Sequence, residues 1–174
     1  MNKTFGLTER YKPLREETTR TVVRYGLTQV DEKNSFWYEV YFNKNRHPVV
    51  TLDDIRDAIL ADINAQTDDK ILSGFVWQEK PVWLSSENQF NFKAAYDLAV
   101  QTKGKSLPVK FKLGENTDGE PVYHSFGDMA EFTDFYTQAI AFINQCLNEG
   151  WERKDGIDWS VYEVLPATAP EITE

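Results

Sequence analysis

The sequence predicts an α+β fold: antiparallel β-hairpins with a long C-terminal amphipathic helix and two further helices. Short segments that alternate apolar and polar residues occur in pairs around polar turns, which is the pattern of hairpins. Three longer segments instead repeat their apolar residues every three or four positions, as amphipathic helices do. With 174 residues and 41% hydrophobic content, the chain is long and apolar enough to bury a core.

The N-terminal part is expected to form an arm, a hairpin and a helix. Residues 1–17 have few large apolar side chains and no regular period, so we expect an extended N-terminal arm. Residues 18–30 and 36–42 alternate around a polar loop, which predicts the first hairpin. Thr51 is the expected N-cap of a helix that completes a module over residues 18–66. The apolar stripe of this helix consists of Leu52, Ile55, Ile59 and Ile63.

Residues 67–165 are expected to form a second α+β module. Residues 71–77 and 82–84 resemble strands joined by a short polar turn, which predicts a second hairpin. Residues 109–113 and 122–126 flank a polar, glycine-containing turn, which predicts a third.

A helix is expected between the second and third hairpins. Ser86 and Gln89 have the spacing of a capping box at its start, and Gly104 is expected to end it. Its predicted apolar face consists of Phe90, Ala94, Ala95, Leu98 and Ala99.

The longest helix is expected over residues 128–148, with Gly150 just past its end. Its wide apolar stripe should be the central packing element of the fold, because so many aromatic groups would not be left in water. The stripe consists of Phe132, Phe135, Tyr136, Ala139, Phe142, Ile143, Cys146 and Leu147. Residues 166–174 are rich in Pro, Ala and Thr, so we expect an extended C-terminal tail.

Charge argues against nucleic acid as the partner. The net charge is −9, whereas phosphate neutralisation requires a concentration of Lys and Arg. The charge is also uneven: residues 1–113 carry +2 and residues 114–174 carry −11. The acidic C-terminal third could therefore orient docking against a basic surface.

Several features bear on the cellular location. Apolar runs such as residues 139–142 are far shorter than the roughly 20 residues that a membrane span requires. Residues 1–10 lack the apolar stretch of a secretory signal, so we expect neither a membrane partner nor export by that route. Cys146 is the only cysteine, which excludes an intrachain disulfide and suits synthesis in a reducing cytosol.

Part of the chain resembles a known family. The resemblance is carried by Lys70–Trp77, Val82–Phe92 with its WLSSENQFN stretch, Pro121–His124 and Gly150–Trp151. Over residues 70–159 the chain resembles an uncharacterised domain family of phage and prophage proteins that is tail- or fibre-associated. The resemblance implies a domain of strand pair, helix, hairpin and helix, without established enzymatic activity. It carries over no functional residue.

The residue types that perform catalysis do not form a recognisable motif. The only histidines, His47 and His124, lie beside no Ser or Cys in a nucleophile motif, and Cys146 falls on the apolar stripe where a buried thiol is expected. Asp53 and Asp57 fit helix capping and a solvated face better than a cation site. We therefore predict no enzymatic activity, no cofactor and no metal.

Five residues are candidate partner contacts. Phe36, Trp37 and Tyr38 are consecutive in a strand, so at least one faces away from the core, and Trp37 is the candidate anchor. The remaining candidates are the basic residues Lys3, Arg10, Lys12 and Arg15 of the expected arm. They could meet the acidic surface of residues 114–174 in another copy.

The leading functional hypothesis is a non-enzymatic bacteriophage virion structural or tail-associated protein that acts through protein-protein contacts. Its partners would be other phage structural proteins and copies of itself. Its location would be the virion, after synthesis in the bacterial host cytoplasm. The alternatives are a tail-fibre assembly chaperone absent from the mature particle and a carbohydrate-binding accessory protein.

Overall fold

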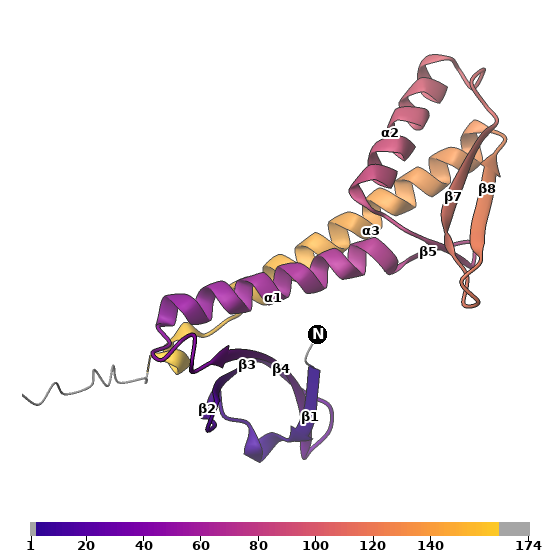
Figure 1. Ribbon diagram of the computed structural model, residues 1–174. Coiled ribbons are helices and arrows are strands. Elements are labelled where there is room, and N and C mark those ends of the chain that lie inside the picture. Colours follow the sequence, from indigo (N-terminus) through magenta and orange to yellow (C-terminus); the bar gives the residue numbers. More distant parts are fainter. Residues whose placement is uncertain (1–2, 164–174) are drawn as a thin grey trace, which may run out of the picture. The chain divides into compact units, whose positions relative to one another are not determined.

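The computed structural model describes residues 3–163 and has the predicted α+β fold, with antiparallel sheets and three α-helices (Figure 1). The tail expected at residues 166–174 lies outside the described residues. The chain divides into two compact units: unit 2 is Ala65–Trp151, and unit 1 comprises the residues before and after it. The first boundary falls close to the one expected between residues 66 and 67. However, residues 152–163 belong to unit 1 and not to the second module.

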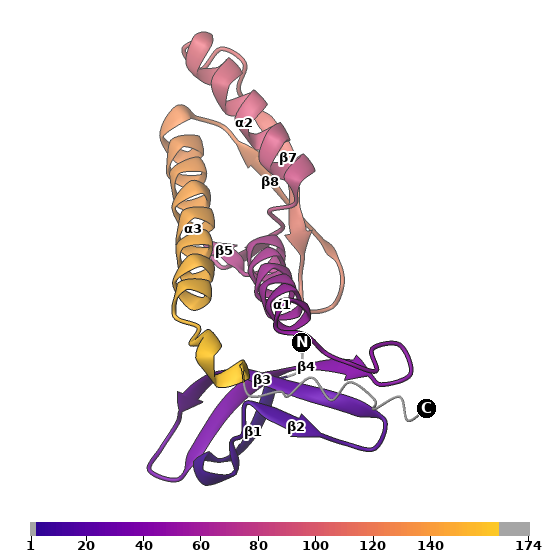
Figure 2. The same cartoon turned by 90° about the vertical axis from the view of Figure 1, so that its left-hand side faces the viewer.

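Unit 1 is built on one antiparallel sheet. Its strands are β1 (Lys3–Leu7), β2 (Leu14–Glu16), β3 (Arg20–Gln29) and β4 (Asn34–Asn43), and a short 3-10 helix, η1 (Thr8–Arg10), follows β1. The strand order is β1-β4-β3-β2, and the two views show the sheet curving round on itself (Figures 1 and 2). The predicted first hairpin is confirmed as β3 and β4, which pair from Arg20↔Asn43 to Gln29↔Ser35.

The prediction of an extended arm at residues 1–17 is wrong for the part that the structure describes. β1 pairs with β4, and β2 pairs with β3. The backbone N–H of Thr8 donates to the carbonyl of Lys33 at 2.8 Å, and that of Arg24 donates to the carbonyl of Pro13 at 2.7 Å. Because backbone hydrogen bonds fix these strands to the sheet edges, they do not need an apolar period of their own.

One face of the sheet packs against α1 (Leu52–Ser73) and the 3-10 helix η2 (Trp159–Tyr162) to form the core of unit 1. Thr51 caps α1 as predicted: its hydroxyl accepts from the Asp54 N–H, and Asp54 accepts from the Thr51 N–H at 2.8 Å. The buried members of this core are Val23, Tyr25, Phe42, Ile55, Ile59, Ile63 and Tyr162.

Helix α1 continues beyond the end expected at residue 66. It runs to Ser73, so only Phe75–Trp77 (β5) of the expected strand 71–77 is extended, and it pairs with Lys80–Val82 (β6). The apolar spacing explains the difference, since Ile71 is two turns beyond Ile63 and is buried in the core of unit 2.

In unit 2, α2 (Ser86–Gln101) packs against α3 (Met129–Asp155). The hairpin of β7 (Val109–Glu115) and β8 (Pro121–Phe126) packs against α3 as well. The aromatic stripe of α3 lies in this core as predicted. The rings of Phe132 and Phe135 are fully buried, and the Phe135 centroid lies 4.9 Å from that of Phe126 and 5.2 Å from that of Trp77.

The sequence predicted that helix α3 ends before Gly150, and this prediction is wrong. The helix begins after Asp128, whose carboxylate accepts from the Ala130 and Glu131 N–H groups, and it runs to Asp155. Gly150 is buried within it, and a Cβ at this position would lie 2.7 Å from the Thr67 hydroxyl. The glycine therefore permits close packing against α1 and is not a terminator.

The buried face of α2 differs from the predicted one. The N-cap is Ser85, one residue earlier than expected, and its hydroxyl accepts from the Asn88 N–H at 3.2 Å. The core side consists of Phe92, Ala95, Tyr96 and Ala99. Phe90 and Leu98 instead point outward and are 71% and 50% exposed.

Candidate functional site

Trp37 is not the exposed anchor that the sequence suggested. Its side chain is 3% exposed, because its ring packs over Gly6 of the neighbouring strand β1 and against Tyr11, which follows η1. The Tyr11 ring contacts it edge-on with centroids 5.6 Å apart, and a Cβ at Gly6 would lie 2.7 Å from its ring. The alternation along β4 is as expected, but the face that carries Trp37 is buried and the opposite face, with Phe36 and Tyr38, is half-buried.

Trp37 belongs to a buried polar cluster that spans β3 and β4. The Nε of Arg24 donates to Glu39 at 2.8 Å, and the Trp37 indole N–H donates to the same oxygen at 3.0 Å. The Tyr41 hydroxyl donates to the other oxygen of the carboxylate at 2.7 Å. Burial raises the pKa of the Glu39 carboxyl, but these three hydrogen bonds and the Arg24 charge outweigh burial and hold the pKa below its ordinary value.

A basic pocket of about 400 Å³ opens beside this cluster, and we refer to it as the arginine pocket. Within residues 3–163, the ionisable side chains that line it are all arginines, so its lining carries three positive charges and no carboxylate. Its lining residues are Phe5, Gly6, Leu7, Arg10, Arg15, Arg24, Asn34 and Trp37.

The arginine pocket brings together three of the five predicted contact residues, namely Trp37, Arg10 and Arg15. The other two lie outside its lining. The Lys3 ammonium lies 3.6 Å from the centroid of the Phe36 ring, and Lys12 is exposed. Sequence reasoning missed Arg24 and Glu39, although each charge has a Val and a Tyr as its strand neighbours and the two pair directly across the hairpin.

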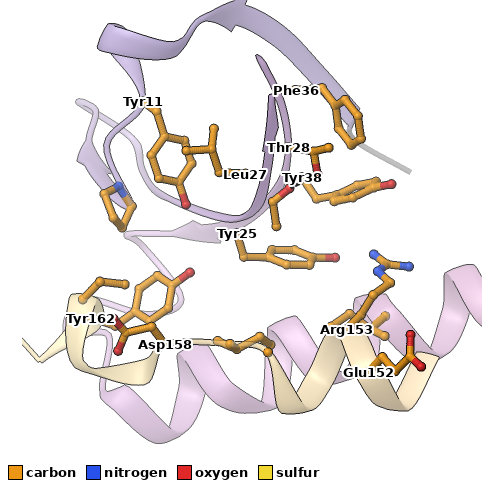
Figure 3. Close-up of a pocket in the computed structure, with 16 residues that line it drawn as sticks. Tyr11, Tyr25, Leu27, Thr28, Phe36, Tyr38, Glu152, Arg153, Asp158 and Tyr162 are labelled. Carbon is orange, nitrogen blue, oxygen red and sulfur yellow. Dashed lines mark hydrogen bonds between the residues drawn. The ribbon is translucent and has the colours of Figure 1, made fainter. Parts of the chain in front are cut away.

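A second pocket of about 530 Å³ lies on the other face of the sheet, and we refer to it as the tyrosine pocket (Figure 3). Tyr25 and Tyr38 enter it from the sheet, and Tyr11 enters it from the segment between η1 and β2. Glu152, Arg153, Asp158 and Tyr162 enter it from the chain at and after the end of α3. The rest of its lining comprises Pro13, Gly26, Leu27, Thr28, Phe36, Ile63, Gly156, Ile157 and Val161.

A β-bulge shapes one wall of the tyrosine pocket. The pairing of β3 with β4 shifts between Tyr25 and Thr28, so that Gly26 and Leu27 lie opposite Trp37 alone. Gly26 has a φ of +64°, which a side chain would disfavour. The bulge therefore turns Leu27 and Thr28 toward the pocket.

Two of the tyrosine hydroxyls around this pocket donate to the same backbone carbonyl. Those of Tyr11 and Tyr162 both donate to the carbonyl of Arg24, at 3.1 and 2.7 Å. Burial raises the pKa of both side chains. The Tyr25 hydroxyl donates to Asp62. The protons of these three hydroxyls are thus already committed to acceptors within the chain.

Helix α2 of unit 2 carries an exposed apolar stripe formed by Phe90, Ala94 and Leu98, which we call the α2 stripe. These residues are spaced by four along the helix and so lie on one face. On the same helix, the Lys93 ammonium pairs with Asp97 at 2.7 Å.

The residues weighed for catalysis have structural surroundings. Cys146 is buried as predicted, and burial raises the pKa of its thiol. The Nε2 of His124 lies 2.9 Å from a Glu131 oxygen, and the His124 ring packs edge-on against Trp77. Across the described residues, no three His, Cys, Asp or Glu side chains are grouped to hold a metal ion. No described helix is long and apolar enough to cross a membrane.

These features define an α+β protein with two units, two pockets in unit 1 and an exposed apolar stripe in unit 2. The chain belongs to the family described as "Domain of unknown function (DUF4376)", whose model matches residues 54–172. The resemblance to an uncharacterised domain family is thus confirmed, over a longer stretch than residues 70–159. Comparisons with curated proteins and with solved structures give no match.

Proposed function

We propose that this chain is a non-enzymatic bacteriophage structural or tail-associated protein that acts through protein-protein contacts. The resemblance of residues 70–159 to phage and prophage proteins supports the phage setting. The α2 stripe supports action by contact. The partners would be other phage structural proteins and copies of this chain, and the location would be the virion.

The observation that carries the proposal is the exposure of the α2 stripe. Unit 2 already has a closed core on the other side of α2, where Phe92 and Ala99 are fully buried. Folding of the unit therefore does not require Phe90 or Leu98. Large apolar side chains at a helical spacing on an outer face are typical of a surface that a partner covers.

The test is mass spectrometry of phage particles purified from an induced host by density gradient. A structural protein would be found in the particles at a constant ratio to the major structural proteins. A tail-fibre assembly chaperone would be bound to fibre protein in the infected cell and absent from the finished particles. Absence of the chain from both the particles and fibre complexes would contradict the proposal.

A carbohydrate-binding accessory role is the second candidate, and the tyrosine pocket is the observation that favours it. Half-buried aromatic rings, Phe36 and Tyr38, line it beside the Glu152 carboxylate and the Arg153 guanidinium. Rings that stack, carboxylates that accept hydrogen bonds from sugar hydroxyls and guanidinium groups that donate to them are the groups that a sugar site needs. Glycan-array binding that is lost in Glu152→Ala would support this role, and an array without signal would exclude the glycans tested.

A further inference from the structure

The arginine pocket has one positive charge that no carboxylate of the described residues pairs. Arg24 is paired with Glu39, and Arg15 has a looser pair with Glu17 at 3.5 Å. Arg10 forms no ion pair within residues 3–163, although it shares the pocket with the other two guanidinium groups. Like charges in one small pocket repel each other, so an anion bound there would relieve the repulsion.

The deepest of the three arginines is held in a fixed position. Arg24 is 8% exposed, and its Nη1 donates to the carbonyl of Arg10 at 3.5 Å in addition to the Nε bond with Glu39. The centre of its guanidinium lies 5.1 Å from the centroid of the Trp37 ring. A preorganised guanidinium loses little freedom on binding, which favours affinity.

The remaining walls favour a particular kind of ligand. Phe5, Gly6 and Leu7 of β1 line one side of the pocket. Apolar walls lower the local dielectric constant and strengthen attraction to an anion. The planar guanidinium groups present paired N–H donors that match the two oxygens of a carboxylate or phosphate.

We propose that the arginine pocket binds an oxyanion, a carboxylate or phosphate group, which Arg10 and Arg15 contact from the rim and Arg24 from the base. The pocket of about 400 Å³ is larger than a single such group, so the natural ligand carries further atoms that occupy the space beside β1. The inference concerns unit 1 alone and does not rest on the proposed function.

The test is a titration of the full chain with inorganic phosphate and, separately, with glutarate, at constant ionic strength set by sodium chloride. Isothermal calorimetry gives the affinity, and the NMR resonance of the Trp37 indole N–H reports binding in this pocket. We expect a Kd on the order of 1 mM for at least one probe. Arg10→Gln and Arg15→Gln should each weaken binding about tenfold, because each removes a charged donor.

Arg46→Gln is the matched control, since Arg46 is an exposed arginine of unit 1 that does not line the pocket. It should leave the affinity unchanged. A response to phosphate alone or to glutarate alone would support the site and identify which oxyanion it takes. No binding of either probe, or equal weakening by Arg46→Gln, would overturn the proposal. Circular dichroism of each variant checks that the fold is retained.

Discussion

Replacing Glu39 by alanine should destabilise unit 1 strongly. The carboxylate accepts hydrogen bonds from Arg24, Trp37 and Tyr41, at 2.8, 3.0 and 2.7 Å, and both members of the ion pair are 8% exposed. The variant would leave a guanidinium and an indole N–H buried without their acceptor. Removing one partner of a buried ion pair costs about 3 to 5 kcal/mol. With an ordinary dependence on denaturant, the urea midpoint should fall by roughly 2 M.

Because the chain has two units, the assay must report unit 1 separately. Hydrogen exchange at the amides of β3 and β4 does so, and β7 and β8 serve as the internal reference. Replacing both charges, with Arg24→Met and Glu39→Leu, should recover the part of the stability that the unpaired guanidinium costs, whereas the Trp37 indole N–H still lacks its acceptor. If Glu39→Ala lowers the free energy of unfolding by less than about 1 kcal/mol, Arg24 and Glu39 do not form a desolvated ion pair.

Three further predictions concern the two units. The pKa of Glu39 in the folded state is below its ordinary value, so the carboxylate stabilises the fold fully at neutral pH. This stabilisation is lost as the pH falls through that pKa. In an acid titration, the Glu39→Gln variant should not show this loss of stability. Phe135→Ala should cost roughly 3 to 5 kcal/mol in a urea titration, and a loss under 1 kcal/mol would mean that this face is not packed. Deleting residues 1–15 should expose Trp37 and broaden the β3 and β4 amide spectrum, whereas an unchanged spectrum would show that β1 is dispensable.

The elements with a regular apolar period could be predicted from the sequence, whereas the strands without such a period could not. The β3–β4 hairpin and the helix stripes were predictable because each buries one face against a core. The strands β1 and β2 were not, since they are held by backbone bonds to sheet edges. The buried position of Trp37 follows from that omission, because its ring packs against Gly6 of β1 and Tyr11.

The candidate site was predictable in part. Arg10, Arg15 and Trp37 were selected from the sequence for basicity and for aromatic character, and they meet in one pocket. The Arg24–Glu39 pair could have been found by counting the hairpin register from its loop, which places the two charges opposite each other. On α2, apolar residues lie on both faces of the helix, so periodicity could not distinguish the buried Phe92 from the exposed Phe90.

The central claim is that the chain acts through protein contacts made by the α2 stripe, and particle incorporation of a stripe variant tests it most directly. The double variant Phe90→Ser and Leu98→Ser removes the stripe, while Val30→Ser with Val49→Ser removes exposed valines of unit 1 as the control. Both should fold, because exposed substitutions usually change stability by about 0.5 kcal/mol or less. The amount of chain in purified particles, measured by quantitative mass spectrometry, should fall about tenfold or more for the stripe variant and stay unchanged for the control. Equal incorporation of the two variants would contradict the claim.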